Sequence, residues 1–507
     1  MFFYTSETPF HKVENDFLRQ AFQILGCNIP HRRELAGKLL EDAYNRVKAR
    51  VDEDLARVCT EEALVYMALA TDGWRKKAAG QGAPLTNVLD QHVDLAKEVT
   101  SGKPERLISV LMDNTKTNLA AMKKLQEKYP TWLCLGCFAH GLALLIKDLA
   151  GLSKKQHAPA VASMLATTNT MANVINDCEA IRTLLHKFQV DLLGERLAVD
   201  VSVPTRFGSH YFVHVSMRRN ERPIKAMLVD DEWDNVKGGS VNSSVFEKCR
   251  GSFWSTVQRV EELIKPVSDA IHQAEADRPL LSQLLRIYNT LVMHAKAWAA
   301  RPDVPASLSR GVVAAFERRF ELHYDPAWAA AFLVDPLFAV NTDGNWGMPF
   351  SELTSQQLRD AKVCITRLVG GGDEDEDKVA AVKEELSKLK LGEIPDTMLE
   401  DLPYIVKRRD NQEVVSIDVR KRWWTQGKAT FPLLGQAAER LLSMHTTACA
   451  TERKWSTFGR IYVKGRSRLE ISKAEKLVFI KGNHAGSAGK GVDEEVALNH
   501  MLEELVQ

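Results

Sequence analysis

Two aspartates in the chain follow segments that have the pattern of buried strands. Residues 61–74, EEALVYMALATDGW, pass from an apolar run into Asp72 and a glycine, and residues 106–113, RLISVLMD, end in the same way at Asp113. Because Mg²⁺ prefers a few carboxylate oxygens and leaves its other positions to water and phosphate, this pair predicts a divalent-metal site. An aspartate after a strand also commonly caps a turn or the next helix, so on these two residues alone both interpretations stay open.

The segments around these aspartates predict a mixed α/β unit over residues 62–150. A polar turn, NTKTN, and a helical stretch, LAAMKKLQEKY, follow Asp113. Residues 131–150 then contain a short apolar segment and a helix that begins near Cys137 or His140.

The rest of the chain is predicted to be mainly helical. Residues 1–61 form a lead-in, in which apolar side chains at 35, 39, 40, 43 and 47 predict the buried face of a helix. Residues 151–435 show helical periodicity with little strand-like alternation. The acidic stretch GGGDEDED at 370–377 is predicted to be a flexible, solvated loop at a subdomain joint. A Gly-rich linker and a helical tail occupy 485–507.

Composition limits the possible classes of protein. The balance of 67 basic and 66 acidic side chains gives a net charge of +1, so any affinity for nucleic acid must be local. No apolar run reaches the roughly 18–20 residues of a membrane span, and the N-terminal residues lack the order of a secretory signal. Eight widely spread cysteines do not form a disulfide framework, which favours a reducing compartment.

Cys137 and His140 are spaced as ligands of zinc often are, and Cys134 extends the pattern to CLGC. A structural zinc site normally needs four ligands, and no second pair lies nearby in the sequence. A buried thiol and a hydrogen-bonded histidine inside the fold are the alternative.

Basic residues gather near the C-terminal end. Residues 451–482 contain nine Lys or Arg against three Glu, a local balance of +6 that could follow a phosphate backbone. The basic positions are Arg453, Lys454, Arg460, Lys464, Arg466, Arg468, Lys473, Lys476 and Lys481. A second cluster, RKRWW at 420–424, mixes charge with aromatic rings. A solvated helix face, or core packing for Trp423 and Trp424, is the alternative in each case.

Several motifs, taken in chain order, resemble the hAT transposase superfamily. They begin with PFHKVENDFLRQAF and RRELAGKLLEDAYNRVKARV in the lead-in and continue with TDGW at 71–74, DNTKTNLAAMKKLQEKYP at 113–130, CFAH at 137–140, PTRFGSHY at 204–211 and HYDPAWAAAFLVDP at 323–336. The last is WWTQGKATFPLLGQAAERLLSMHTTACATERKWSTFGRI, which begins at residue 423. The resemblance covers nearly the whole chain.

The resemblance implies an RNase H-like core that is interrupted by a helical insertion at 151–435 and closed by a dimerisation segment at 436–484. Asp72, Asp113 and Glu452 would be its acidic triad and would hold two Mg²⁺ or Mn²⁺ ions for DNA cleavage and joining. Arg206 and Phe207 match an Arg-Trp pair that contacts DNA, with Phe in place of Trp, and core packing is the alternative for them.

Cys137 and His140 would support the same implied active site. Leu433, Leu434, Leu441, Leu442 and the segment LVFI at 477–480 resemble the dimerisation region, or they form ordinary core. The implied partners are DNA and a second copy of the chain, and no membrane is expected. Because chromosomal DNA is the expected partner, we expect a nuclear protein, although the sequence has no decisive nuclear signal.

The sequence departs from the family pattern in two places. Only 41 positions separate Asp72 from Asp113, too few for the strand hairpin that family members usually have, and no Cys/His zinc finger precedes residue 62. We therefore expect an α/β core, shortened, with a large all-α insertion, in a domesticated or decayed transposase that binds DNA and dimerises. An active Mg²⁺-dependent transposase and a non-catalytic protein-interaction scaffold are the alternatives.

Overall fold

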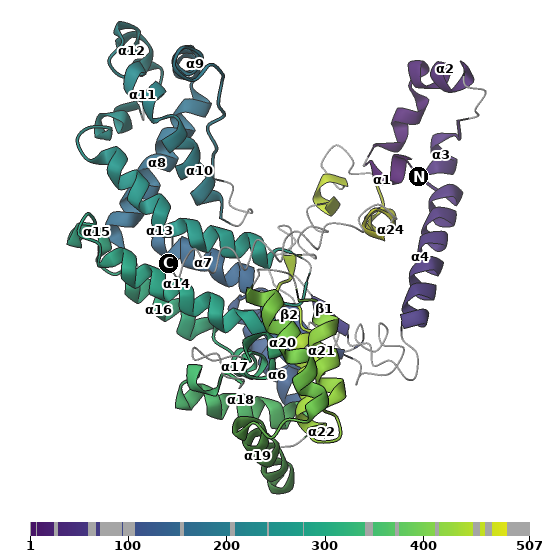
Figure 1. Ribbon diagram of the computed structural model, residues 1–507. Helices are drawn as coiled ribbons and strands as arrows, with labels where there is room; N and C mark the ends of the chain where they lie inside the picture. The colour runs from purple at the N-terminus through teal and green to yellow at the C-terminus, as the bar shows by residue number, and fades with distance from the viewer. Residues whose placement is uncertain are drawn as a thin grey trace. The chain divides into compact units, whose positions relative to one another are not determined.

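The computed structural model of the 507-residue chain consists mostly of helices with one small sheet (Figure 1). It describes residues 2–6, 8–24, 29–58, 67–70, 94, 107–152, 157–202, 208–240, 243–276, 278–339, 348–370, 375–410, 415–449, 457–461 and 469–483. The chain forms two compact units. Met1–Val110 and Ala448–Val492 belong to the first, and Leu111–Thr447 and Asp493–Gln507 belong to the second.

The sheet has three strands among the described residues, β1 (Met67–Ala70), β2 (Leu107–Met112) and β3 (Leu133–Gly136), in the order β1-β2-β3. All six side chains of the central strand, β2, are buried. A strand that is covered on both faces has a continuous apolar sequence, which is why LISVLM signals it clearly. The predicted strand before Asp113 is confirmed.

Two helices follow β2 and β3 directly. In α6 (Lys116–Lys128), the side chain of Thr115 caps the first turn by accepting from the Asn118 amide, and the apolar residues Ala121, Met122 and Leu125 are buried. In α7 (Phe138–Leu149), which has Cys137 at its N-cap position, nine of the twelve residues are buried. The predicted β-turn-α order of residues 106–150 is therefore confirmed.

The second unit continues as a helical block, which confirms the helical prediction for the described part of 155–435. Its helices are α8 (Pro159–Asp177), α9 (Glu179–Leu193), α10 (Ser209–Arg219), α11 (Glu221–Met227), α12 (Asp231–Val236), α13 (Phe253–Ala274), α14 (Leu284–Ala299), α15 (Ala306–Ser309), α16 (Val312–His323), α17 (Pro326–Val334), α18 (Ser355–Leu368), α19 (Glu376–Leu391), α20 (Asp396–Asp410), α21 (Ile417–Gln426) and α22 (Pro432–Leu442). Short 3₁₀ turns η3 (Lys237–Gly239), η4 (Ser243–Lys248), η5 (Leu281–Gln283), η6 (Pro336–Phe338) and η7 (Phe350–Glu352) lie between them.

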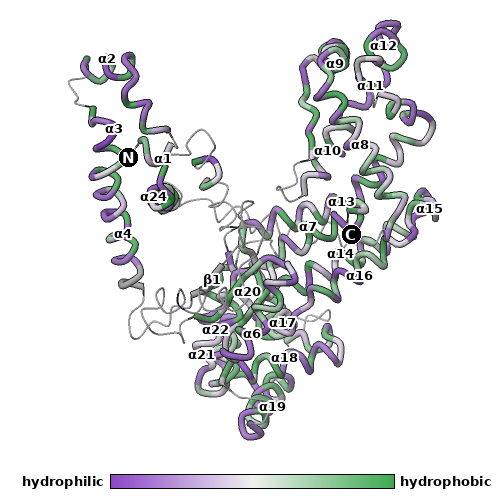
Figure 2. The backbone as a smooth tube through the Cα atoms, turned by 180° about the vertical axis from the view of Figure 1, so that it is seen from behind, coloured by the Kyte–Doolittle hydropathy of each residue, from purple (hydrophilic) through white to green (hydrophobic). Residues whose placement is uncertain are grey.

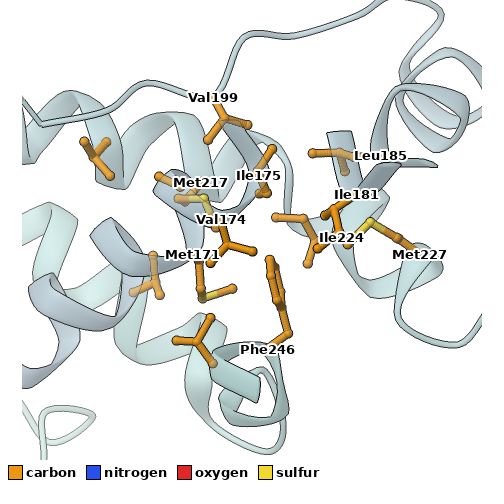
Figure 3. Packing of buried hydrophobic residues seen from close by; sticks show 14 of the residues in the cluster. Met171, Val174, Ile175, Ile181, Leu185, Val199, Met217, Ile224, Met227 and Phe246 are labelled. Carbon is orange, nitrogen blue, oxygen red and sulfur yellow. The ribbon is translucent and has the colours of Figure 1, made fainter. Parts of the chain in front are cut away.

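One apolar core holds helices α8 to α11 together with η4. Figure 3 shows side chains of these elements converging on one another, among them Met171, Ile181, Ile224 and Phe246. All four are at most 3% exposed. The helical part of this unit therefore has a packed core of its own, beyond the helices that border the sheet.

The first unit joins the N-terminal helices to a helix close to the C-terminal end of the sequence. Its helices are α1 (Phe2–Thr5), η1 (Phe10–Glu14), α2 (Asp16–Ile24), α3 (Arg32–Leu35), α4 (Lys38–Val58) and α24 (Ile471–Asn483). Hydrophilic and hydrophobic residues alternate along α4 (Figure 2), and its buried residues pack with Ala474, Leu477 and Ile480 of α24. The predicted helical lead-in is confirmed, with one correction. Leu39 is 38% exposed because it falls off the stripe that Leu35, Leu40, Ala43 and Val47 bury.

The acidic stretch at 370–377 is not a loop throughout, and that prediction is wrong for its last residues. Asp375 caps α19 by accepting from the Lys378 amide, and Glu376 and Asp377 form the first turn of the helix. Carboxylates stabilise a helix N-terminus through its unpaired N–H groups and its dipole. An acidic run therefore starts this helix, and residues 371–374 lie outside the described residues.

The aromatic residues of RKRWW belong to the core. Trp423 and Trp424 are fully buried, and their indole N–H groups donate to the carbonyl oxygens of Met398 (2.7 Å) and Val334 (2.8 Å). Arg420 is buried too and pairs with Asp335 at 2.6 Å. The packing alternative for Trp423 and Trp424 therefore holds.

No helix in the described ranges is both long enough and apolar enough to span a membrane. The six cysteines that the structure describes are free thiols.

Replacing Asp335 with Ala should lower the free energy of unfolding by about 3–5 kcal/mol, because it removes a buried carboxylate that pairs with the buried Arg420 at 2.6 Å. The matched control is Asp401→Ala, because Asp401 pairs with the exposed Arg422 at 3.8 Å. This replacement should lower the free energy of unfolding by less than about 1 kcal/mol. Urea unfolding of both variants measures the difference. Equal losses would contradict the assignment of Asp335 and Arg420 as a buried structural pair.

Candidate functional site

Asp113 lies at the carboxyl end of the central strand, one residue after Met112. Its Oδ1 atom accepts from the amide of Thr115 (3.2 Å) and from the side-chain amide of Asn118. The Oδ2 atom accepts no hydrogen bond from the described residues. Asp113 thus shapes the turn into α6 and keeps one carboxylate oxygen available, so the capping and metal-binding interpretations both remain possible.

Three hydrogen bonds join the end of β2 to the beginning of α7. The Cys137 amide donates to the Met112 carbonyl (2.7 Å), and the Asn114 amide donates to Nδ1 of His140 (3.0 Å). The Asn114 side chain donates to the Cys137 carbonyl (2.8 Å). The Cys-x-x-His segment therefore holds the backbone on both sides of Asp113.

The protonation state of His140 follows from its bonding. Because Nδ1 accepts from a backbone N–H, the ring proton of the neutral imidazole lies on Nε2. Burial lowers the pKa of His140, and the nearby Asp113 carboxylate opposes this shift only in part. A neutral ring is the form that this contact requires, so burial and hydrogen bonding agree.

Two glycines allow this close packing. A Cβ atom at Gly136 would lie 2.0 Å from Oδ1 of Asn114, and one at Gly141 would lie 2.6 Å from the ring of His323. Gly136 therefore leaves room for the Asn114 side chain, and Gly141 lets α16 approach α7.

A buried ion pair holds α7 against α16. Nε of Arg319 donates to Oδ2 of Asp148 at 2.9 Å, and both side chains are largely shielded from water. The ring of Phe138, in the first turn of α7, meets those of Tyr288 and Trp328 edge-on at 6.1 and 5.6 Å. The helix that carries His140 is therefore anchored at both ends.

A cavity of about 420 Å³ lies beside this junction. Asn114, Gly136 and Cys137 line it from the strand ends, and His323 and Arg367 line it from the helices. Crevices at the carboxyl ends of strands commonly bind ligands in open α/β sheets. The cavity reaches the end of β2 through Asn114, and neither Asp113 nor His140 lines it.

The zinc alternative is not supported. The residues that the structure describes, Cys134, Cys137 and His140 included, contain no group of three or more His, Cys, Asp or Glu placed to hold a metal ion. Burial also raises the pKa of Cys134 to about 12, which disfavours the thiolate that zinc binds.

Most of the other predicted site residues lie outside the described residues. They are Asp72, Glu452, Arg206, Phe207, Arg453, Lys454, Lys464, Arg466 and Arg468. Arg460 is described, is exposed, and donates to Oγ1 of Thr457 at 3.1 Å. The predictions for the acidic triad and for most of the basic patch therefore remain predictions.

Sequence reasoning did not single out Asn114 and Gly136 as site residues. Asn114 stands in DNTKTN and Gly136 in CLGC. In these motifs the neighbouring residues, Asp113 and Cys137, were predicted as site residues. The sequence feature that could have indicated them is the glycine directly before Cys137. A glycine at a strand end often marks the close approach of another group.

A comparison with protein-family models identifies one region of the chain. Residues 410–484 match the hAT family C-terminal dimerisation region. This match supports a hAT superfamily transposase-like protein. No curated protein matches the chain.

The matched hAT region contributes to both compact units. It contains α21 and α22 of the second unit and α24 of the first. Leu434, Leu441 and Leu442 of α22 and Ile480 of α24 are at most 1% exposed, so these positions are core within each unit. The region's description supports self-association of this hAT-like chain.

Replacing Gly136 with Ala should destabilise the protein by about 1–3 kcal/mol, because the new methyl group displaces the Asn114 side chain from the Cys137 carbonyl. In an Asn114→Ala background the same replacement should cost much less, since its clash partner is gone. Gly238→Ala, with nothing within 4 Å of the added Cβ, is the control and should change stability by less than about 0.5 kcal/mol. Thermal unfolding of this double-mutant cycle gives the coupling, and additive effects would contradict the proposed packing.

Proposed function

We propose that this chain is a hAT transposase-derived protein that binds DNA and dimerises, in a domesticated or decayed form that retains an RNase H-like acidic triad. The observation that carries the proposal is the position of Asp113 at the end of the central strand, with its turn bonded to Cys137 and His140. Asp72 and Glu452 complete the triad in this proposal.

The geometry at Asp113 suits a metal ligand. Its Oδ2 atom is not engaged by the described residues, and a carboxylate oxygen is the donor that Mg²⁺ and Mn²⁺ prefer. When bound, such ions would activate water or a 3′-hydroxyl and stabilise the leaving oxygen. The protein's own part is to hold Asp113 in place, which Asn114, Cys137 and His140 do through backbone and side-chain hydrogen bonds.

The DNA-binding part of the proposal rests on local charge. The chain is nearly neutral overall, yet residues 451–482 carry a balance of +6, and the described Arg460 is exposed. Basic side chains displace counterions from the phosphate backbone, so even a short patch gives salt-dependent affinity. Arg206 and Phe207 are proposed as further contacts, and a nuclear location follows from chromosomal DNA as the partner.

The decayed or domesticated form is proposed because the interval between Asp72 and Asp113 is short, at 41 positions. Two-metal catalysis tolerates little displacement of its carboxylates, so a shortened sheet between Asp72 and Asp113 would weaken catalysis before it weakens binding.

Removing three charges with Arg453→Gln, Lys454→Gln and Arg460→Gln should weaken DNA binding and reduce the salt slope by up to about three, since each phosphate contact contributes about 0.9 to the slope. A gel shift at several salt concentrations measures this. The control, Arg359→Gln with Lys362→Gln and Lys383→Gln, removes equal charge from exposed residues of α18 and α19 and should leave the slope unchanged. Equal effects of the two triple variants, or no binding by the parent, would favour the scaffold alternative.

Catalysis should be absent or close to background in a nicking and strand-transfer assay with Mg²⁺ or Mn²⁺. The same assay is run on Asp113→Ala and Glu452→Ala, and all three proteins should give similar traces. Clear activity of the parent that both substitutions abolish would instead establish the active transposase. The available Oδ2 atom of Asp113 is the specific feature that favours this alternative.

A further inference from the structure

The first unit contains a groove of about 500 Å³ between the N-terminal helices and α24. Its apolar wall includes Phe3, Phe10, Ile461, Leu469 and Leu477. These residues belong to, or pack against, the core that joins the two ends of the sequence. The groove is thus a hydrophobic surface built partly from the matched hAT region, residues 410–484.

Basic groups line this groove together with the apolar residues. His11, Arg32, Arg33 and Lys473 line it, against the single carboxylate of Glu470. Arg32 and Lys473 have acidic partners, Glu14 at 3.8 Å and Glu470 at 3.2 Å. Arg33 makes no ion pair with the described residues and is exposed. The groove therefore suits a ligand that carries both apolar and acidic groups.

The sequence after α24 has this chemistry. Residues 492–507, VDEEVALNHMLEELVQ, contain five carboxylates and no Lys or Arg. Leu498, Met501, Leu502 and Leu505 follow the spacing i, i+3, i+4, i+7, which predicts one apolar face of a helix. Amphipathic helices commonly bind hydrophobic grooves with such a face. Residues 492–507, the acidic tail, lie outside the described residues.

The connection between groove and tail has a suitable length. Lys473 of the groove stands ten residues before Asn483, the last residue of α24, a distance of about 15 Å along the helix axis. The eight residues 484–491, HAGSAGKG, form a Gly-rich linker whose root-mean-square span is about 16 Å. A linker that matches the span gives the highest effective concentration, in the millimolar range.

We propose that the acidic tail docks into this groove of its own chain as an amphipathic helix. Leu498, Met501, Leu502 and Leu505 face the apolar wall, and the carboxylates of the tail lie near Arg33. Because Ile461, Leu469 and Leu477 belong to the matched hAT region, the docked tail covers part of that region's surface. This proposal does not depend on DNA binding or on catalysis.

The test uses a fluorescent synthetic peptide of residues 492–507 and two full-length chains, the parent and a tail variant with Leu498→Asp and Leu502→Asp. The peptide should bind the tail variant at least about tenfold more tightly than the parent, because the tethered tail occupies the parent's groove. Fluorescence anisotropy measures both affinities. Equal binding to the two chains, or no binding to either, would overturn the proposal.

Charge substitutions in the tail variant identify the surface that binds the peptide. Arg33→Glu should weaken peptide binding by about three- to tenfold. Arg46→Glu is the matched control, since Arg46 is an exposed arginine of α4 that does not line the groove, and it should leave the affinity unchanged. No effect of Arg33→Glu, or equal effects of the two substitutions, would place the peptide elsewhere and overturn the proposal.

Light scattering distinguishes the chain's own tail from that of a second copy. Docking within one chain predicts that the tail variant has the same mass as the parent or a larger one. A smaller mass for the tail variant would mean that the tail binds a second copy, which would overturn docking within the chain.

Discussion

The three hydrogen bonds between the end of β2 and the start of α7 are the constraint on which the candidate site depends. They link Met112 to Cys137 and Asn114 to both Cys137 and His140. Backbone groups at a strand end must find partners when they are buried, and here a neighbouring helix N-terminus supplies them. The turn that carries Asp113 is therefore positioned by part-buried hydrogen bonds, which fix the place of this carboxylate.

The surrounding helices serve the same constraint. The Arg319 and Asp148 pair and the aromatic contacts of Phe138 hold α7, while Gly136 and Gly141 allow Asn114 and His323 to come close. The last helix of the matched hAT region, α24, packs with the N-terminal helices of the first unit. Residues distant in the sequence therefore build one core. The match to a dimerisation region supports self-association of this chain.

The sequence predicted the elements whose signals are local. LISVLM and the segment before Cys137 are apolar because they are buried, and the stripe through Leu35, Leu40, Ala43 and Val47 marks one helix face. The ambiguous segments were those where one composition suits two environments. The acidic run was predicted as a solvated loop, and its last residues instead begin a helix, as Asp375 shows. For RKRWW the sequence left phosphate binding and core packing open, and Trp423 and Trp424 are buried in the core. The roles of Asn114 and Gly136 depend on contacts across 22 or more positions, which no local pattern encodes.

The most direct measurement is a crystal structure of the full chain with Mn²⁺, with anomalous scattering used to locate the ion. The account predicts a peak bonded to Oδ2 of Asp113, with Asp72 and Glu452 as its other protein ligands and His140 still accepting from the Asn114 amide. A map with no ion at Asp113, and with Glu452 remote from the end of β2, would contradict it.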